Sequence, residues 1–439
     1  MEAAAVYRAV VQHKRTAGLQ FRAGSRSACA MLPGFVWLTS RMSILSHTPP
    51  GIAPTERVDA VDVLRGFALL GIFVVNLTQF ASGYQSQGLP DPRFTSPWDQ
   101  AADWLVRFAF EGKFYLLFTF LFGYSFMLSL RRSAAEGARF ERRFLRRLLA
   151  LAGLGAAHAC LFYPGDALLP YALLGLLLFL WRGWTVTGWM VVGGGLWLGL
   201  SAVYLLIAVA PWDGEGDAAL LVEAASRAQE MEAALRAGWL PTLRENLVRW
   251  GEYAWGLLLF QGPMSLAMFL AGAAAARAGV LSRGWRVPAA VVWVAAAIGV
   301  AGALYYAEHG EREEIASLVK SYAALVLTAP ALSAALAAGL LAAARWAWGR
   351  RLHAWLAPAG RMTLTLYLMQ SVVGALVFTG WGAAAVGQWG PAAVLGLAVF
   401  VFVVQLGLAT WWLRHHREGP MEAALRRWTR AGEGVSAPR

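Results

Sequence analysis

The chain has 439 residues, of which 58% are hydrophobic, and it contains 21 Trp and 22 Phe. This composition excludes an ordinary soluble domain, since one core would not hide so much apolar surface, and it indicates a polytopic membrane protein. The net charge of +12 does not indicate nucleic acid, because the basic residues form short clusters between apolar runs.

Residues 1–56 mix Arg, Gly, Ser and Pro with one apolar patch, "ACAMLPGFVWL". The patch is too short and too interrupted by proline to span a bilayer. The segment also lacks the long apolar region and the cleavage site of a signal peptide. We expect residues 1–56 to be a disordered N-terminal extension, and Met42 is an alternative start of the protein.

A transmembrane helix needs about 20 mainly apolar residues. Ten segments approach this length: 62–81, 106–130, 146–163, 167–182, 185–210, 253–276, 287–306, 318–344, 362–380 and 392–413. The predicted fold is therefore all-α, a polytopic membrane helix bundle of about ten transmembrane helices. Residues 57–210 form its N-terminal membrane half, and residues 253–413 form its C-terminal membrane half.

Arginines are densest in "RRSAAEGARFERRFLRR", and further clusters fall on the same side of the membrane if there are ten spans. The positive-inside rule makes this side cytoplasmic and places both termini there. Residues 211–252 then form an external loop with apolar residues at helical spacing, which predicts amphipathic helices on the membrane surface. Residues 414–439 are expected to form a cytoplasmic amphipathic tail on anionic lipid.

The chain has no Walker loop, G-x-S-x-G, H-E-x-x-H or C-x-x-C motif, so the sequence does not favour ATP-driven transport by this chain alone. The two cysteines, Cys29 and Cys160, do not form a disulfide framework. His415 and His416 are adjacent and point in different directions on a helix, which makes them a poor metal pair. We expect no metal and no tightly bound cofactor.

Polar residues interrupt the first two spans. Asp62 and Arg65 share one helix face, where they form either an interfacial ion pair or a cytoplasmic mouth that binds an anionic ligand. Asn76 lies further out, and its amide either bonds another helix or contacts a substrate carbonyl. Lys113 lies within one turn of Glu111 and Tyr115 at the outer end of the second span. Its compact ammonium serves either a site or a surface ion pair with Glu111.

The stretch "HACLFYPGDALLPYALLG" places two ionisable residues on either side of a Pro-Gly turn. Asp166 stands where the next helix begins, so its plainest role is to cap that helix. His158 lies inside a span, where an ionisable side chain is costly unless it faces the bundle interior or a wet cavity. A neutral histidine bonded to another helix is the structural alternative. If Asp166 folds back toward His158, the pair would be a general base with its orienting carboxylate.

Five stretches together resemble the YeiB-like family of bacterial multi-pass membrane proteins, which carry a C-terminal domain of unknown function. They are "RVDAVDVLRGFALLGIFVVNL", "EGKFYLLFTFLFGYSF", "HACLFYPGDALLPYALLG", "GRMTLTLYLMQSVV" and "WWLRHHREGPMEAALRRWTR", and the resemblance covers residues 57 to 430. It implies a multi-pass protein of the bacterial plasma (inner) membrane.

The first span is also similar to that of the heparan-alpha-glucosaminide N-acetyltransferase group, through Asp62, Arg65, Gly66 and Asn76. That resemblance implies acyl transfer from cytosolic acyl-CoA to an acceptor on the far side of the membrane. The group uses a histidine shortly after the Asn, whereas this chain has none between His47 and His158. His158 would therefore act from another helix.

The leading hypothesis is a transmembrane acyltransferase-like protein with His158 as general base and Asp166 as its orienting carboxylate. The candidate substrate-binding residues are Asp62, Arg65, Asn76, Glu111, Lys113, Tyr115, Tyr171 and Gln370. Acyl-CoA is the expected co-substrate, the acceptor is a sugar or a lipid, and membrane lipids and a second copy of the chain are possible partners. The alternatives are a proton-coupled small-molecule or lipid transporter and a non-catalytic membrane scaffold.

Overall fold

The computed structural model describes residues 59–133, 138–210, 215–256, 259, 261–281, 287–310 and 315–430. Secondary structure in these ranges is helical and contains no strand, which confirms the predicted all-α fold. The expected N-terminal extension and the alternative start at Met42 lie outside the described residues.

The helices are α2 (Asp59–Ala81), α3 (Gly83–Gln87), α4 (Pro97–Ala109), α5 (Phe114–Ser133), α6 (Ala138–Leu161), α7 (Leu168–Leu180), α8 (Val186–Ala208), α9 (Glu215–Arg236), α10 (Trp239–Gly256), α11 (Gly262–Arg277), α12 (Ala289–His309), α13 (Ile315–Ala343), α14 (Ala347–Arg361), α15 (Thr363–Phe378), α16 (Pro391–His415) and α17 (Pro420–Arg430).

Seven helical segments of the described chain are long and apolar enough to cross a membrane, and an eighth is added if α14 and α15 count as one broken span. The chain is therefore a multi-pass membrane protein. Each of the ten predicted segments contains a helix, but three of these helices are shorter than a span requires. The helix α7 has 13 residues, and α11 and α15 have 16 residues each. The difference between seven or eight candidates and about ten comes from these three helices.

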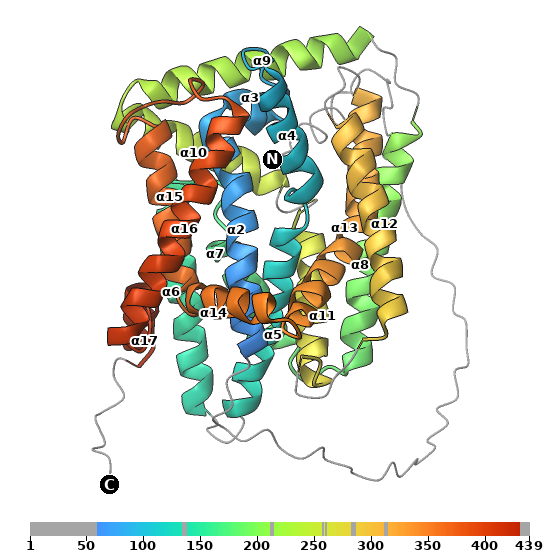
Figure 1. Ribbon diagram of the computed structural model, residues 1–439, viewed down its shortest axis with the longest axis vertical. Coiled ribbons are helices and arrows are strands. Elements are labelled where there is room, and N and C mark those ends of the chain that lie inside the picture. The colour runs from blue at the N-terminus through green and yellow to red at the C-terminus, as the bar shows by residue number, and fades with distance from the viewer. Residues whose placement is uncertain are drawn as a thin grey trace, which may run out of the picture.

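Helix α2 runs through the middle of the bundle and packs against α5, α14, α15 and α16 (Figure 1). Two glycines allow α2 and α14 to touch through their backbones. A Cβ atom on Gly66 would overlap the carbonyl of Leu356, and a Cβ atom on Gly360 would overlap the carbonyl of Asp62. Small residues permit such close approach of helices in a membrane, so these glycines position the start of α2, where Asp62 and Arg65 lie.

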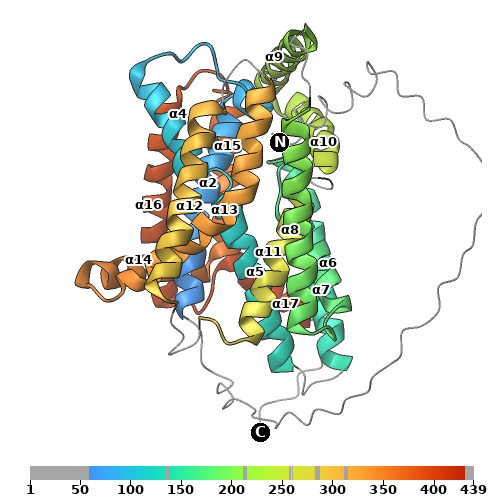
Figure 2. The same cartoon turned by 90° about the vertical axis from the view of Figure 1, so that its right-hand side faces the viewer.

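Helix α14 lies across the direction of the other helices (Figure 2), and the chain bends by 82° between α14 and α15. Its exposed side chains include Trp348, Trp355, Arg350 and Arg351. Tryptophan and arginine together are typical of a helix at the boundary between lipid and water. The predicted span at 362–380 therefore begins at this bend rather than continuing straight from α14.

Helix α9 crosses the opposite end of the bundle, which we call the α9 end (Figure 1). An ion network fastens it there, in which two buried carboxylates are held by two partly exposed arginines. We call this network the α9 clamp: Asp91, Arg93, Glu232 and Arg236. Arg93 donates to Asp91 Oδ1 at 2.7 Å and to Glu232 Oε2 at 2.7 Å. Gly387 has φ +73° and leaves room for these side chains, because a Cβ atom there would overlap Arg93 and Glu232.

At the other end of the bundle, the last helix is fastened to the start of α15. Glu422 on α17 accepts hydrogen bonds from the amides of Leu364 at 2.8 Å and Thr365 at 3.2 Å, and from Thr365 Oγ1 at 2.6 Å. The first amides of a helix have no partner within the helix, and a carboxylate there also interacts favourably with the helix dipole. We call this arrangement the Glu422 cap.

Replacing Gly360 tests the crossing of α2 and α14. We expect Gly360→Ala to lower the free energy of unfolding by about 1–3 kcal/mol, because the added methyl group overpacks a backbone contact. Thermal melting of the detergent-solubilised protein measures the effect. The matched control, Gly407→Ala, adds a methyl group where nothing lies within 4 Å and is expected to leave the melting temperature unchanged or slightly higher. An equal response of the two variants would contradict the crossing.

The α9 clamp predicts a dependence of stability on pH. Burial raises the pKa of Asp91, but hydrogen bonds from Arg93 and Ser82 outweigh it, so the net pKa lies below the ordinary 3.8. Asp91 therefore contributes stability above about pH 4 and loses it as the pH falls through its lowered pKa. We expect the melting temperatures of the wild type and Asp91→Asn to converge below pH 4. The exposed control Glu223→Gln should show no such convergence, and a constant difference down to pH 3 for Asp91→Asn would refute the assignment.

Candidate functional site

His158 lies near the end of α6, three residues before the helix stops at Leu161. The amides of Phe162 and Tyr163 both donate to its carbonyl, at 2.9 and 3.0 Å, which turns the chain toward α7. The imidazole is buried, with 2% of the residue exposed, and its Nδ1 lies 2.8 Å from Asp166 Oδ1. The hairpin therefore brings together the two residues whose pairing the sequence predicts.

Asp166 has two roles, one for each oxygen. Its Oδ2 accepts from the amide of Leu169 at 2.9 Å, which caps the first turn of α7. Its Oδ1 holds His158 and also receives the hydroxyl of Tyr367 at 3.4 Å. A Cβ atom on Gly155 would lie 2.5 Å from Oδ2, so a glycine on α6 makes room for the carboxylate. Both expected roles of Asp166, helix cap and partner of His158, are present together.

The carboxylate decides which imidazole nitrogen is available for chemistry. Because Nδ1 faces Asp166, the neutral ring carries its proton on Nδ1 and presents a lone pair at Nε2. Within the described part of the chain, Nε2 is buried and makes no hydrogen bond. The rings of Phe162, Tyr163 and Tyr367 surround the imidazole, with centroids 6.4, 6.5 and 5.2 Å away. We call His158 and Asp166 the dyad.

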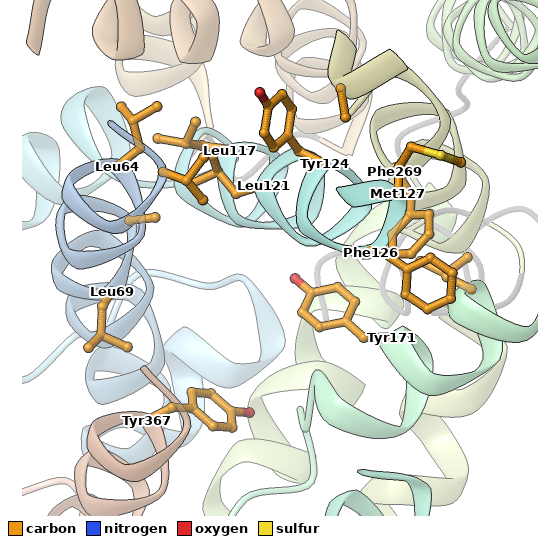
Figure 3. Close-up of a cluster of buried hydrophobic side chains, with 14 of the residues drawn as sticks. Leu64, Leu69, Leu117, Leu121, Tyr124, Phe126, Met127, Tyr171, Phe269 and Tyr367 are labelled. Atoms are coloured by element: carbon orange, nitrogen blue, oxygen red, sulfur yellow. The ribbon is translucent and has the colours of Figure 1, made fainter. Parts of the chain in front are cut away.

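Asn76 and Tyr171 lie in the surroundings of the dyad. The hydroxyl of Tyr163 donates to Gln79 Oε1 at 2.6 Å and lies 3.2 Å from Asn76 Oδ1. The ring of Tyr163 therefore lies between these α2 side chains and His158. Tyr171 shares a 3.0 Å hydrogen bond with Thr119 on α5 and interacts electrostatically with Asp166. Figure 3 shows the hydroxyls of Tyr171 and Tyr367 pointing toward the interior of the bundle from α7 and α15.

Helix α10 contributes polar residues that the sequence reading did not select. Its buried side chains include Thr242, Glu245, Asn246 and Arg249, which lie on one face at spacings of three and four residues. Asn246 Nδ2 lies 3.3 Å from the carbonyl of Cys160 on α6. The expectation that residues 211–252 form amphipathic helices on the membrane surface stays a prediction. The structure adds that α10 buries these polar side chains within the protein. The signal in the sequence was their helical spacing.

Glu111 and Lys113 belong to a second polar cluster rather than to the dyad. Glu111 Oε2 accepts from the hydroxyl of Tyr306 on α12 at 2.6 Å, and Lys113 Nζ donates to the carbonyl of Arg107 at 2.7 Å. Lys113 is only 1% exposed, so its ammonium group lies inside the protein rather than on its surface. The half-buried Tyr115 accepts through its carbonyl from Thr119, at 2.7 Å.

Three further candidates lie elsewhere. Arg65 Nη1 is 3.6 Å from Asp62 Oδ1 at the start of α2, on the side away from α9 (Figure 1). Gln370 is buried on α15 and donates to Gln405 on α16 at 2.9 Å. Its Oε1 has no hydrogen-bond partner among the described residues. The ranges that the structure describes contain no group of three His, Cys, Asp or Glu residues suited to a metal.

The C-terminal part of the chain, residues 275–432, matches the family described as "Protein of unknown function (DUF418)". The chain is 29% identical to the "Uncharacterized protein YxaH" of Bacillus subtilis (strain 168) over 84% of this chain and 92% of that protein. It is 29% identical to the "Uncharacterized protein YeiB" of Escherichia coli (strain K12) over 87% of this chain and 99% of that protein. The predicted YeiB-like resemblance is confirmed.

A third relative covers less of the chain. The "Uncharacterized 39.9 kDa protein in amylase 3'region" of Bacillus acidopullulyticus is 40% identical over 29% of this chain and 34% of that protein. No solved structure matches the chain. The likeness to YxaH and YeiB extends over most of the chain, whereas the family match begins at residue 275 and does not include the dyad.

Removing the carboxylate tests the double role of Asp166. We expect Asp166→Ala to lower the free energy of unfolding by about 2 kcal/mol, because α7 loses its cap and the buried His158 loses its partner. Asp166→Asn should lower the free energy of unfolding by less than Asp166→Ala, since the asparagine oxygen still accepts a hydrogen bond from the amide of Leu169. Melting curves of the two variants in detergent measure this order. Wild-type stability in Asp166→Ala would mean that the hairpin does not depend on the carboxylate.

Proposed function

We propose that this YeiB-like protein is a transmembrane acyltransferase of the bacterial inner membrane. It moves an acyl group from cytosolic acyl-CoA to a hydroxyl or amine acceptor at the extracytoplasmic face. The observation that carries the proposal is the buried dyad, in which Asp166 holds His158 by Nδ1 while Nε2 makes no hydrogen bond in the described chain. This geometry supports the role of His158 as general base and of Asp166 as its orienting carboxylate.

The dyad supplies the proton transfers of acyl transfer. Nε2 of His158 takes the proton of the acceptor hydroxyl while the acceptor oxygen attacks the thioester carbonyl carbon. The new C–O bond forms, the C–S bond breaks, and CoA leaves as a thiolate that takes the proton back from the imidazolium. Asp166 fixes the tautomer of the ring and stabilises the imidazolium during the step, and Tyr367 holds the carboxylate in place.

Arg65 in the second turn of α2 and Arg147 in the first half of α6 support a binding site for the CoA phosphates. Arg65 and Arg147 lie close enough for their charges to repel each other. Like charges held together in this way favour an anionic ligand, and guanidinium groups suit phosphate geometry. The distance from Arg65 to the level of Asn76 along α2 is about 16 Å at the rise of a helix. The pantetheine arm of CoA would have to cover this distance to bring the thioester to the dyad.

The function is tested by binding and by transfer. Acetyl-CoA, octanoyl-CoA or palmitoyl-CoA is expected to raise the melting temperature of the purified protein. Labelled acyl groups should move from the bound donor into an extract of bacterial envelope lipids and glycans. We expect His158→Gln to reduce this transfer by about 10²–10⁴-fold while donor binding persists, since only the general base is removed.

His309→Gln is the matched control, because His309 stacks on Tyr305 and has no contact with the dyad. It should leave transfer unchanged. No stabilisation by any of the three donors, or full transfer by His158→Gln, would exclude the acyltransferase. A solute flux into liposomes that His158→Gln abolishes, without acyl transfer, would instead support a proton-coupled transporter.

A further inference from the structure

Arg249 on α10 is a buried arginine without an acidic partner among the described residues. Only 3% of the residue is exposed, and no carboxylate of the described chain lies within 4.0 Å of its guanidinium. The two nearest glutamates along α10, Glu245 and Glu252, are both bound by Arg227 of α9, at 2.6 and 3.2 Å. Arg249 therefore carries a positive charge that its helix neighbours do not neutralise directly.

Neutral hydroxyls hold the guanidinium in one orientation. Nη2 donates to Tyr253 Oη at 2.8 Å and to Ser86 Oγ at 3.3 Å, and Nε donates to Tyr253 Oη at 3.2 Å. Ser86 Oγ in turn donates to the carbonyl of Gln79 on α2. The Nη1 amino group makes no hydrogen bond with the described residues, so one side of the guanidinium fork is available.

Arg249 lies next to the surroundings of the dyad. Both Arg249 and Tyr253 interact electrostatically with Tyr163, whose ring centroid is 6.5 Å from that of His158. Asn246, one turn earlier on α10, contacts the carbonyl of Cys160, two residues after His158. The face of α10 that carries Asn246 and Arg249 therefore lies beside the end of α6 that carries His158.

We propose that Arg249 binds an anionic group, a phosphate or a carboxylate, of the acceptor whose hydroxyl or amine meets His158. The assignment of that acceptor rests on the proposed acyl transfer, whereas the anion site itself does not. A buried charge is costly unless it is paired, and truncating a buried charged pair weakens binding strongly. Guanidinium is also the side chain best suited to two-pronged recognition of carboxylate or phosphate.

The source of the anion is either a lipid headgroup or a small soluble molecule, and the probes distinguish them. Phosphatidylglycerol combines a phosphodiester with free hydroxyls, and dioleoylglycerol is its neutral counterpart. Soluble sn-glycerol 3-phosphate and glycerate carry a phosphate and a carboxylate, and glycerol is their neutral counterpart. Native mass spectrometry of the full chain for the lipids, and thermal shift for the soluble probes, measure binding in the absence of any acyl donor.

The wild type should bind at least one anionic probe about tenfold more tightly than its neutral counterpart, and Arg249→Gln should remove this preference. Arg244→Gln is the matched control, because Arg244 is exposed on the same helix, and it should keep the preference. Tyr253→Phe is a milder variant that removes a hydroxyl holding the guanidinium. Tyr253→Phe should weaken binding of the anionic probe and leave binding of the neutral probe unchanged. This variant keeps the test valid if Arg249→Gln does not fold.

The outcomes separate this site from the proposed reaction. His158→Gln is expected to retain the preference for the anionic probe, since it leaves Arg249 in place. An Arg249-dependent preference in a protein that transfers no acyl group would keep the anion site and reject the acyltransferase. The opposite result is a protein that transfers acyl groups but whose wild type, Arg249→Gln and Tyr253→Phe forms bind each probe equally well. That result would keep the reaction and overturn this inference.

Discussion

The carboxylate of Asp166 is the interaction on which this end of the bundle depends, because it must be satisfied where no bulk water solvates it. A carboxylate in an apolar interior is tolerated only when its oxygens accept hydrogen bonds. The structure meets this requirement with three partners from three helices: His158 on α6, the amide of Leu169 on α7, and Tyr367 on α15. The shape of the hairpin and the glycine at position 155 follow from this requirement.

The requirement for hydrogen-bond partners also distinguishes the cluster around Lys113 from the dyad. In the cluster around Lys113, two backbone carbonyls and the carboxylate of Glu111 accept the polar hydrogens of Lys113, Ser333 and Tyr306, so these contacts fasten α4 and α5 to α12 and α13. The dyad is different because its distal imidazole nitrogen has no partner in the described chain. An unsatisfied buried acceptor costs about 1–3 kcal/mol, so the unbonded Nε2 is the feature on which the proposed chemistry rests.

The sequence predicted the helices and the dyad for the same reason, since both are local. Apolar run lengths located all ten helical segments, and the Pro-Gly turn places His158 and Asp166 only eight residues apart. Tyr367 is 201 residues away from Asp166, and only the packing of α15 brings it there. The polar pattern of α10 was readable, but an amphipathic period does not say whether the polar face meets water or protein. The burial of Arg249 and its lack of an acidic partner in the described chain therefore became visible only in the structure.

The Glu422 cap connects the far terminus of the chain with the dyad. Glu422 fixes the first turn of α15, and Tyr367 stands in the following turn with its hydroxyl against Asp166. Contacts through α15 and Asp166 thus link the final helix to the imidazole, although the two lie at opposite ends of the molecule. Loosening the C-terminal segment, by truncation or by a bulky fusion, would free α15 to shift and would alter the alignment of His158 and Asp166 from a distance.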